Sequence, residues 1–236
     1  MSVGEPATQD YVAQFYPIRY SGSGFVYHSR IVTTMLDGVR MSDRHSDKIL
    51  DLGCGIGFVS QLYPNFDIIG IDTSAEMLKR NPHKCQVGAA EAIPFPDATF
   101  DWVICRSLLH HLDEPLRGLR EVARILKPGG RFVCWETNFS PLNDVVRRLA
   151  RHTPRFSHWH KNFKSDELMQ LIRQSGLLIE RVTYHGYLAY VLGGFPDILN
   201  LHIPVGVMRR SNQHGGRTRH MDFAVGGYQD RENSLA

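Results

Sequence analysis

Three glycines spaced two residues apart form the stretch of this sequence whose chemistry is easiest to interpret. Gly53, Gly55 and Gly57 follow directly after the predicted strand 47–52. Because glycine has no side chain, a glycine loop that leaves a strand lets backbone atoms approach a ligand closely. Such a loop can hold a phosphate, a dinucleotide or another adenosine compound.

Two of these ligand classes need motifs that the loop lacks. A phosphate-binding loop needs Gly-x-x-x-x-Gly-Lys-Ser/Thr, and no lysine follows the glycines here. A dinucleotide fingerprint that starts at Gly53 needs its third glycine at position 58, where Phe58 stands. The Gly-x-Gly-x-Gly spacing therefore favours an adenosine ligand without a pyrophosphate.

Predicted strands and helices alternate along the chain around this loop. Apolar runs predict strands over 47–52, 66–71, 84–87, 101–105, 131–136, 177–185 and, as a last strand, 221–225. Apolar spacing and capping residues predict helices over about 26–40, 73–81, 115–126 and 165–175, the second opened by a capping box of Thr73 and Glu76. This alternation predicts an α/β fold with a mostly parallel sheet, whose ligands bind at the carboxyl ends of the strands.

Four segments in this order, "ILDLGCGIG", "GIDTSAEML", "AEAIPFPDATFDWVICRSLLHHL" and "EVARILKPGGRFV", resemble class I S-adenosylmethionine-dependent methyltransferases. The branch that they resemble includes the ubiquinone and menaquinone methyltransferases. The resemblance implies a three-layer Rossmann-like fold, with a seven-stranded, mostly parallel sheet that has one antiparallel strand. It also implies a single domain, 1–236, made of N-terminal cap helices (1–45), a cofactor-binding half (46–137) and an acceptor-side half with a tail (138–236).

The resemblance implies that S-adenosyl-L-methionine is the cofactor, and it assigns the contacts to its methionine and ribose parts. Residues 53–57, with Gly53, Cys54, Gly55 and Gly57, match the loop around the methionine part. Asp51 matches the acid near the amino group, and a carboxylate suits an ammonium. Asp72 matches the acid that accepts both ribose hydroxyls, for which a carboxylate offers two oxygens.

The remaining cofactor contacts are expected around the adenine and beside the methyl group. Thr73 and Met77 are expected against the adenine ring, with Ala89, Ala90 and Glu91 in the adenine loop. Ala89 stands where the family usually has Asp, which removes one hydrogen bond worth about 1 kcal/mol, and Glu91 is a candidate replacement. The other expected contacts are the backbone of Cys105 and Arg106, and Tyr20 in the aromatic arm with Tyr11, Phe15 and Tyr16.

His110 and His111, which follow the fourth predicted strand, are the candidate catalytic residues. Histidine suits proton removal near neutral pH. Because the two residues are adjacent, we expect them to point in different directions, with at most one facing the acceptor. The alternative is that both anchor the loop to backbone carbonyls, and the resemblance favours it, because members of the family often carry a histidine here without a catalytic role. His158 and His160 form a second, weaker candidate pair.

The composition of this 236-residue chain limits the classes of partner that it is expected to bind. Its net charge of +3 does not indicate a nucleic-acid partner, and no apolar run is long enough to cross a membrane. Its four cysteines form no CxxC pair, so we expect reduced thiols in a cytoplasmic protein and no metal site. The apolar run 184–208 could cover an acceptor or touch a membrane surface, although core or dimer contacts are the simpler interpretation.

These features predict methyl transfer to an oxygen or carbon of an apolar or aromatic small molecule, by a monomer or homodimer. Two other functions remain open. One is an RNA or protein methyltransferase, for which the basic stretch "RRSNQHGGRTRH" is the only support. The other is a cofactor-binding protein of the same fold without turnover.

Overall fold

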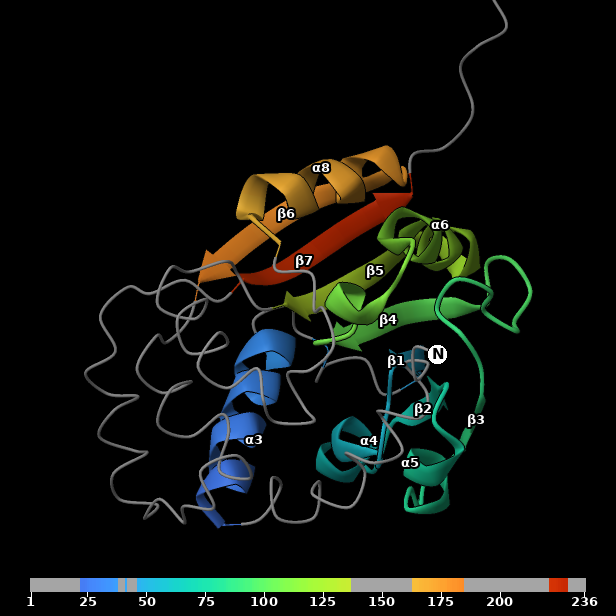
Figure 1. Ribbon diagram of the computed structural model, residues 1–236, viewed down its shortest axis with the longest axis vertical. Coiled ribbons are helices and arrows are strands. Elements are labelled where there is room, and N and C mark those ends of the chain that lie inside the picture. The colour runs from blue at the N-terminus through green and yellow to red at the C-terminus, as the bar shows by residue number, and fades with distance from the viewer. Residues whose placement is uncertain (1–21, 38–40, 42–45, 137–162, 185–220, 229–236) are drawn as a thin grey trace, which may run out of the picture.

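The computed structural model describes residues 22–37, 41, 46–136, 163–184 and 221–228 (Figure 1). Its strands are β1 (Lys48–Leu52), β2 (Asp67–Asp72), β3 (Cys85–Val87), β4 (Phe100–Arg106), β5 (Leu126–Glu136), β6 (Leu177–Tyr184) and β7 (Met221–Tyr228). They form one sheet in the order β3-β2-β1-β4-β5-β7-β6. Strands β1 to β5 pair in parallel, as the alternation predicts, and β7 runs antiparallel to both β5 and β6.

Helices cover both faces of the sheet. The helical elements are α3 (Gly22–Asp37), α4 (Phe58–Leu62), α5 (Ala75–Lys79), the short 3-10 helix η2 (Leu109–His111), α6 (Pro115–Ile125) and α8 (Ser165–Gln174). Apolar residues of α3 and α4 pack with β1, β4 and β5 in one core cluster. Residues of α6, α8 and η2 pack with the same strands in a second cluster, and α6 and α8 lie away from α3 and α4 in Figure 1. None of the helices in these ranges is long and apolar enough to cross a membrane.

The alternation of side chains along each strand decides which face a polar residue reaches. Ile49 of β1 and Ile104 of β4 belong to the core under α3 and α4. Asp51 and Arg106 each come two residues later in the same strands, so they lie on that same face. In β5, Cys134 belongs to the opposite core, under α6. Glu136, two residues further on, therefore lies on the α6 face.

Two local predictions were wrong. The helix after β2 is capped by Ser74, whose hydroxyl accepts the N–H of Met77 at 3.2 Å, and not by a Thr73–Glu76 capping box. The reason is that the Asp72 carboxylate accepts the N–H of Ser74 at 2.9 Å, which keeps the chain non-helical up to Ser74. The helix predicted from residue 26 begins at Gly22 instead.

Candidate functional site

The glycine loop leaves β1 with three residues in the left-handed region. Gly53, Gly55 and Gly57 have φ of 77°, 50° and 82°, which L side chains rarely adopt. The N–H groups of Gly53 and Cys54 donate to the carbonyl of Ile71 at 2.9 and 3.0 Å, so the loop is tied to the end of β2. The loop backbone therefore lies at the carboxyl ends of two central strands, where this kind of sheet binds ligands.

Asn81 braces the loop from outside, whereas its sequence pattern, Asn-Pro, predicts only the end of a helix. Its amide donates to the carbonyl of Gly55 at 3.2 Å and to Cys54 Sγ at 3.6 Å. A methyl group on Gly57 would overlap the Asn81 side chain. The Cys54 side chain is buried against Gly70 of β2, and burial is the main cause that raises the pKa of its thiol. Cys54 thus contributes to the loop as a packed, neutral residue.

Asp72, at the end of β2, points its carboxylate at the glycine loop. One oxygen accepts the N–H of Gly55 and the other accepts the N–H of Ser74, both at 2.9 Å. Burial raises the pKa of Asp72, while these backbone donors and the charge of His111 lower it. The backbone N–H of Thr73 is a third donor to this carboxylate, whose two oxygens together offer about four acceptor positions, so capacity for a ribose hydroxyl remains.

Asp51 is a buried carboxylate with an unsatisfied oxygen. Its side chain is 2% exposed, and its Oδ2 has no hydrogen-bond partner in the described part of the chain. Burial raises its pKa to about 7, Arg106 opposes this rise, and Asp72 adds to it. Because a buried charge without a partner is costly, a positively charged group of a ligand would be favoured here. The ammonium group of an amino acid fits this requirement.

The residues expected to contact adenine differ in their exposure and in their hydrogen-bond partners. Thr73 is exposed, whereas Met77 is 2% exposed. Ala89 bridges to Ala92 in the adenine loop, and Ala90 is buried. We expected Glu91 to replace the missing acid of this loop, but its Oε1 accepts the N–H of Glu114 at 2.9 Å. That oxygen of Glu91 is therefore used at the start of α6.

Glu136 organises the segment that carries the two histidines. Its Oε1 accepts the N–H groups of Leu108 and Leu109, both at 2.7 Å, and its Oε2 lies 2.6 Å from Nδ1 of His110. Glu136 and His110 are buried, so the contact is shielded from water. The expectation that the histidine rings point apart was wrong, because the ring centroids of His110 and His111 lie 4.1 Å apart. No local sequence pattern singles out Glu136.

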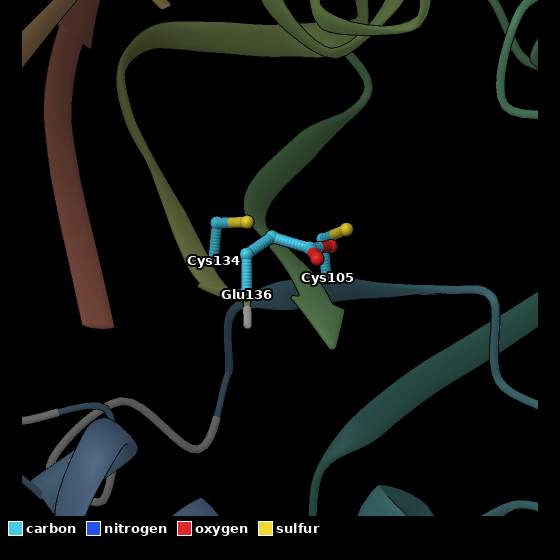
Figure 2. A group of neighbouring side chains, drawn as sticks. All are labelled: Cys105, Cys134 and Glu136. Carbon is cyan, nitrogen blue, oxygen red and sulfur yellow. The ribbon is translucent and has the colours of Figure 1, made fainter. Parts of the chain in front are cut away.

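Glu136 also lies beside two buried thiols, as Figure 2 shows. One ligand atom each of Cys105, Cys134 and Glu136 lies within 4.8 Å of the others, because Cys105 and Cys134 are register partners in β4 and β5. Contact with Cys134 lowers the pKa of the Cys105 thiol. Burial and the negative charges of Glu136 and Asp51 together raise this pKa by more, so the net shift is upward. A metal-binding cysteine must be a thiolate. A raised pKa and a carboxylate that already accepts three hydrogen bonds fit a packed core better than a metal centre.

Several expected residues lie outside the described residues. They are Tyr20 with the rest of the aromatic arm, His158, His160 and the apolar run after Tyr184. Among the described residues, the structure brings Asp51, the glycine loop, Asp72 and Arg106 together at the carboxyl ends of strands β1, β2 and β4. The Glu136–His110 pair follows at the ends of β5 and β4.

Comparison with known proteins agrees with this arrangement. Residues 50–134 match the family described as "Methyltransferase domain". A demethylmenaquinone methyltransferase of Anoxybacillus flavithermus is 33% identical over 195 residues, which cover 67% of this chain and 82% of that protein. The uncharacterized methyltransferase YcgJ of Bacillus subtilis is 29% identical over 148 residues, or 53% of this chain and 58% of YcgJ. Two further curated relatives are matched over 47% and 44% of their lengths, so the chain spans about half the length of these three relatives.

A solved structure supports the fold over almost the whole chain. A methyltransferase from Thermotoga maritima, described as a possible histamine N-methyltransferase, superposes with a TM-score of 0.67 at 17% identity, covering 95% of this chain and 99% of that one. The Rossmann-like methyltransferase fold with a parallel sheet is therefore confirmed. The chain belongs to the class I S-adenosylmethionine-dependent methyltransferases. The predicted cofactor, S-adenosylmethionine, is the one that this family uses.

Proposed function

We propose that the protein transfers a methyl group from S-adenosylmethionine to an oxygen or carbon of an apolar or aromatic small molecule. The observation that carries this proposal is Asp51, whose buried Oδ2 lacks a hydrogen-bond partner within the described residues, next to the glycine loop. The cofactor, when bound, supplies an activated methyl group on a sulfonium. Asp51 would then hold the ammonium, and the free acceptor positions of Asp72 would hold the ribose.

The acceptor class is inferred from the relatives and from the charge of the chain. The relative from Anoxybacillus flavithermus is named a demethylmenaquinone methyltransferase, and its acceptor type would be an aromatic, largely apolar ring. The small net charge of +3 favours an acceptor of this kind over a nucleic acid. We further propose that 46–137 binds the cofactor, and that 138–236 contributes the acceptor side of a single domain.

His110 is our candidate for the base that removes the acceptor proton, with Glu136 as its positioning residue. A buried carboxylate 2.6 Å from Nδ1 favours the tautomer in which Nδ1 carries the proton and donates it to Glu136. Nε2 of His110 is then the basic nitrogen. We rank His111 second as a base, because its charge also lowers the pKa of Asp72, the proposed ribose acid.

Calorimetry with S-adenosylmethionine and S-adenosylhomocysteine tests the cofactor assignment. Transfer of a labelled methyl group from S-adenosylmethionine to a panel of naphthoquinols and phenols then tests the acceptor class. We expect binding of both nucleosides and a labelled quinol or phenol product. Failure of both nucleosides to bind would refute the proposal, and methylation of RNA or protein alone would refute the acceptor class.

The substitution Glu136→Gln tests the base without removing the histidine. An amide can still accept the N–H groups of Leu108 and Leu109, but its NH₂ would donate to Nδ1 of His110 and so reverse the tautomer. We expect turnover to fall at least about 100-fold at unchanged cofactor affinity, as when a triad carboxylate becomes an amide. Nitrogen NMR of the His110 ring should show the proton moving from Nδ1 to Nε2. A reversed tautomer with full turnover would exclude His110 as the base.

A further inference from the structure

Arg106, the last residue of β4, holds its guanidinium over the start of α4. Its Cζ lies 5.3 Å from the ring centroid of Phe58, which follows Gly57 directly. Its Nη1 lies 3.4 Å from Nδ1 of His28 in α3, and because a guanidinium can only donate, the ring nitrogen accepts. These two contacts place a permanent positive charge over the ring of Phe58, the residue that follows the last glycine of the loop.

The same face of the sheet carries the buried negative charge of Asp51. Asp51 pairs in register with Ile104, and Arg106 is the next residue of β4 on that face. The positive charge of Arg106 also opposes the upward shift in the pKa of Asp51, so the two side chains attract each other electrostatically. Nevertheless, Oδ2 of Asp51 has no hydrogen-bond partner within the described residues.

A carboxylate acceptor and a guanidinium donor on neighbouring strands match the two charges of an amino acid. The ammonium and the carboxylate of such a group share one carbon, and a guanidinium can bind a carboxylate through two parallel N–H donors. We propose that Arg106 binds the α-carboxylate of the methionine part of S-adenosylmethionine, while Asp51 binds its ammonium group. This inference rests on the proposed function. It replaces our expectation that Arg106 meets the cofactor through backbone atoms.

The competing explanation is that Arg106 only offsets the charge of Asp51. In that case, removing the guanidinium would weaken every ligand that carries an ammonium, whether or not it also carries a carboxylate. If Arg106 binds the carboxylate, its removal weakens ligands that have one more than ligands that carry only the ammonium. Three ligands separate these explanations. S-adenosylhomocysteine has both charged groups, decarboxylated S-adenosylmethionine keeps only the ammonium at this end, and 5′-methylthioadenosine has neither.

The experiment measures the dissociation constants of these three ligands by calorimetry for the full chain and three variants. The variants are Arg106→Gln, Arg106→Lys and, as a matched control, Arg131→Gln. Arg131 of β5 stacks on the ring of Trp102 at 5.5 Å, so the control removes a similar cation–aromatic contact on the neighbouring strand, outside the site. Thermal unfolding without ligand checks that each variant is folded. Arg106→Lys keeps the charge if the glutamine variant does not fold.

We expect Arg106→Gln to weaken S-adenosylhomocysteine about 10- to 100-fold, the range for a hydrogen bond to a charged group. Its affinity for 5′-methylthioadenosine should stay within about twofold of that of the unmodified protein. Its loss for decarboxylated S-adenosylmethionine, which comes only from the higher pKa of Asp51, should be clearly smaller than its loss for S-adenosylhomocysteine. Arg106→Lys should lose less, because it keeps the charge but not the two parallel donors. Arg131→Gln should bind all three ligands normally.

Two outcomes would overturn the inference while leaving the proposed function intact. One is unchanged affinity of Arg106→Gln for S-adenosylhomocysteine. The other is an equal loss for S-adenosylhomocysteine and decarboxylated S-adenosylmethionine, which would assign Arg106 to Asp51 alone. Failure of the unmodified protein to bind S-adenosylhomocysteine would instead refute the proposed function itself, and with it the inference.

Discussion

The buried carboxylate of Asp51 makes the stability of the ligand-free protein depend on pH. Burial raises its pKa from 3.8 to about 7. The pKa of Asp51 in the folded protein lies above its pKa in the unfolded chain. The contribution of Asp51 to the free energy of unfolding is therefore fully present below pH 3.8, and it is lost as the pH rises through about 7. At 1.36 kcal/mol per pKa unit, the loss amounts to about 4 kcal/mol.

Asp51→Asn removes this charge but leaves a buried amide that itself costs about 1 to 3 kcal/mol. We therefore expect the variant to raise the free energy of unfolding at pH 8 by about 1 to 3 kcal/mol, with little gain or a loss at pH 4. Urea unfolding at both pH values measures this difference. An equal change at pH 4 and pH 8 would show that Asp51 is not a strained buried charge.

Cofactor binding should show the opposite dependence on pH. An ammonium selects the ionised form of Asp51, so protonated Asp51 must first lose its proton. With a pKa of about 7, the affinity for S-adenosylhomocysteine should fall about 25-fold between pH 7.5 and pH 5.5. Calorimetry in two buffers of different ionisation enthalpy should also detect proton release at pH 6. Asp51→Asn should bind weakly with no such slope, and a slope that persists in this variant would refute our account of the ammonium site.

Two further predictions concern the cofactor loop and the ribose acid. Asp72→Ala should weaken the binding of S-adenosylhomocysteine at least about 100-fold, because the ribose loses a charged acceptor. The control Asp67→Asn, at the other end of β2, should bind normally in the same calorimetric titration. Normal binding by Asp72→Ala would contradict the ribose assignment. Gly57→Ala should lower the free energy of unfolding by more than the about 1 to 2 kcal/mol that positive φ alone costs, because the methyl group also overlaps Asn81. Gly129→Ala is its control in urea unfolding, having φ of 77° and open space around it, and equal losses in the two variants would show that Asn81 does not brace the loop.

The sequence predicts the parts of this site that lie within one continuous motif. Asp51 and the glycines follow a strand directly, and Asp72 ends the next strand, so local pattern is enough to place them. The Glu136–His110 contact depends on how β4 and β5 pair, and 26 residues separate its two partners. No local pattern encodes that register.

Competition between neighbouring polar groups explains other differences. Thr73 and Ser74 are both suitable caps by residue type, and the Asp72 carboxylate decides between them through the N–H of Ser74. Glu91 is a suitable adenine partner by position, yet one of its oxygens accepts the N–H of Glu114. In both cases a contact with another polar group settles what the residue type leaves open.

The separation of polar groups between the two faces of the sheet decides which helices support each of them. Asp51 and Arg106 emerge beneath α3 and α4, whereas Glu136 shares the α6 side with Cys134. Substitutions in the core beneath α3 and α4 should therefore disturb Asp51 and Arg106 first, whereas substitutions beneath α6 should disturb Glu136 and, through Ala90, the adenine loop.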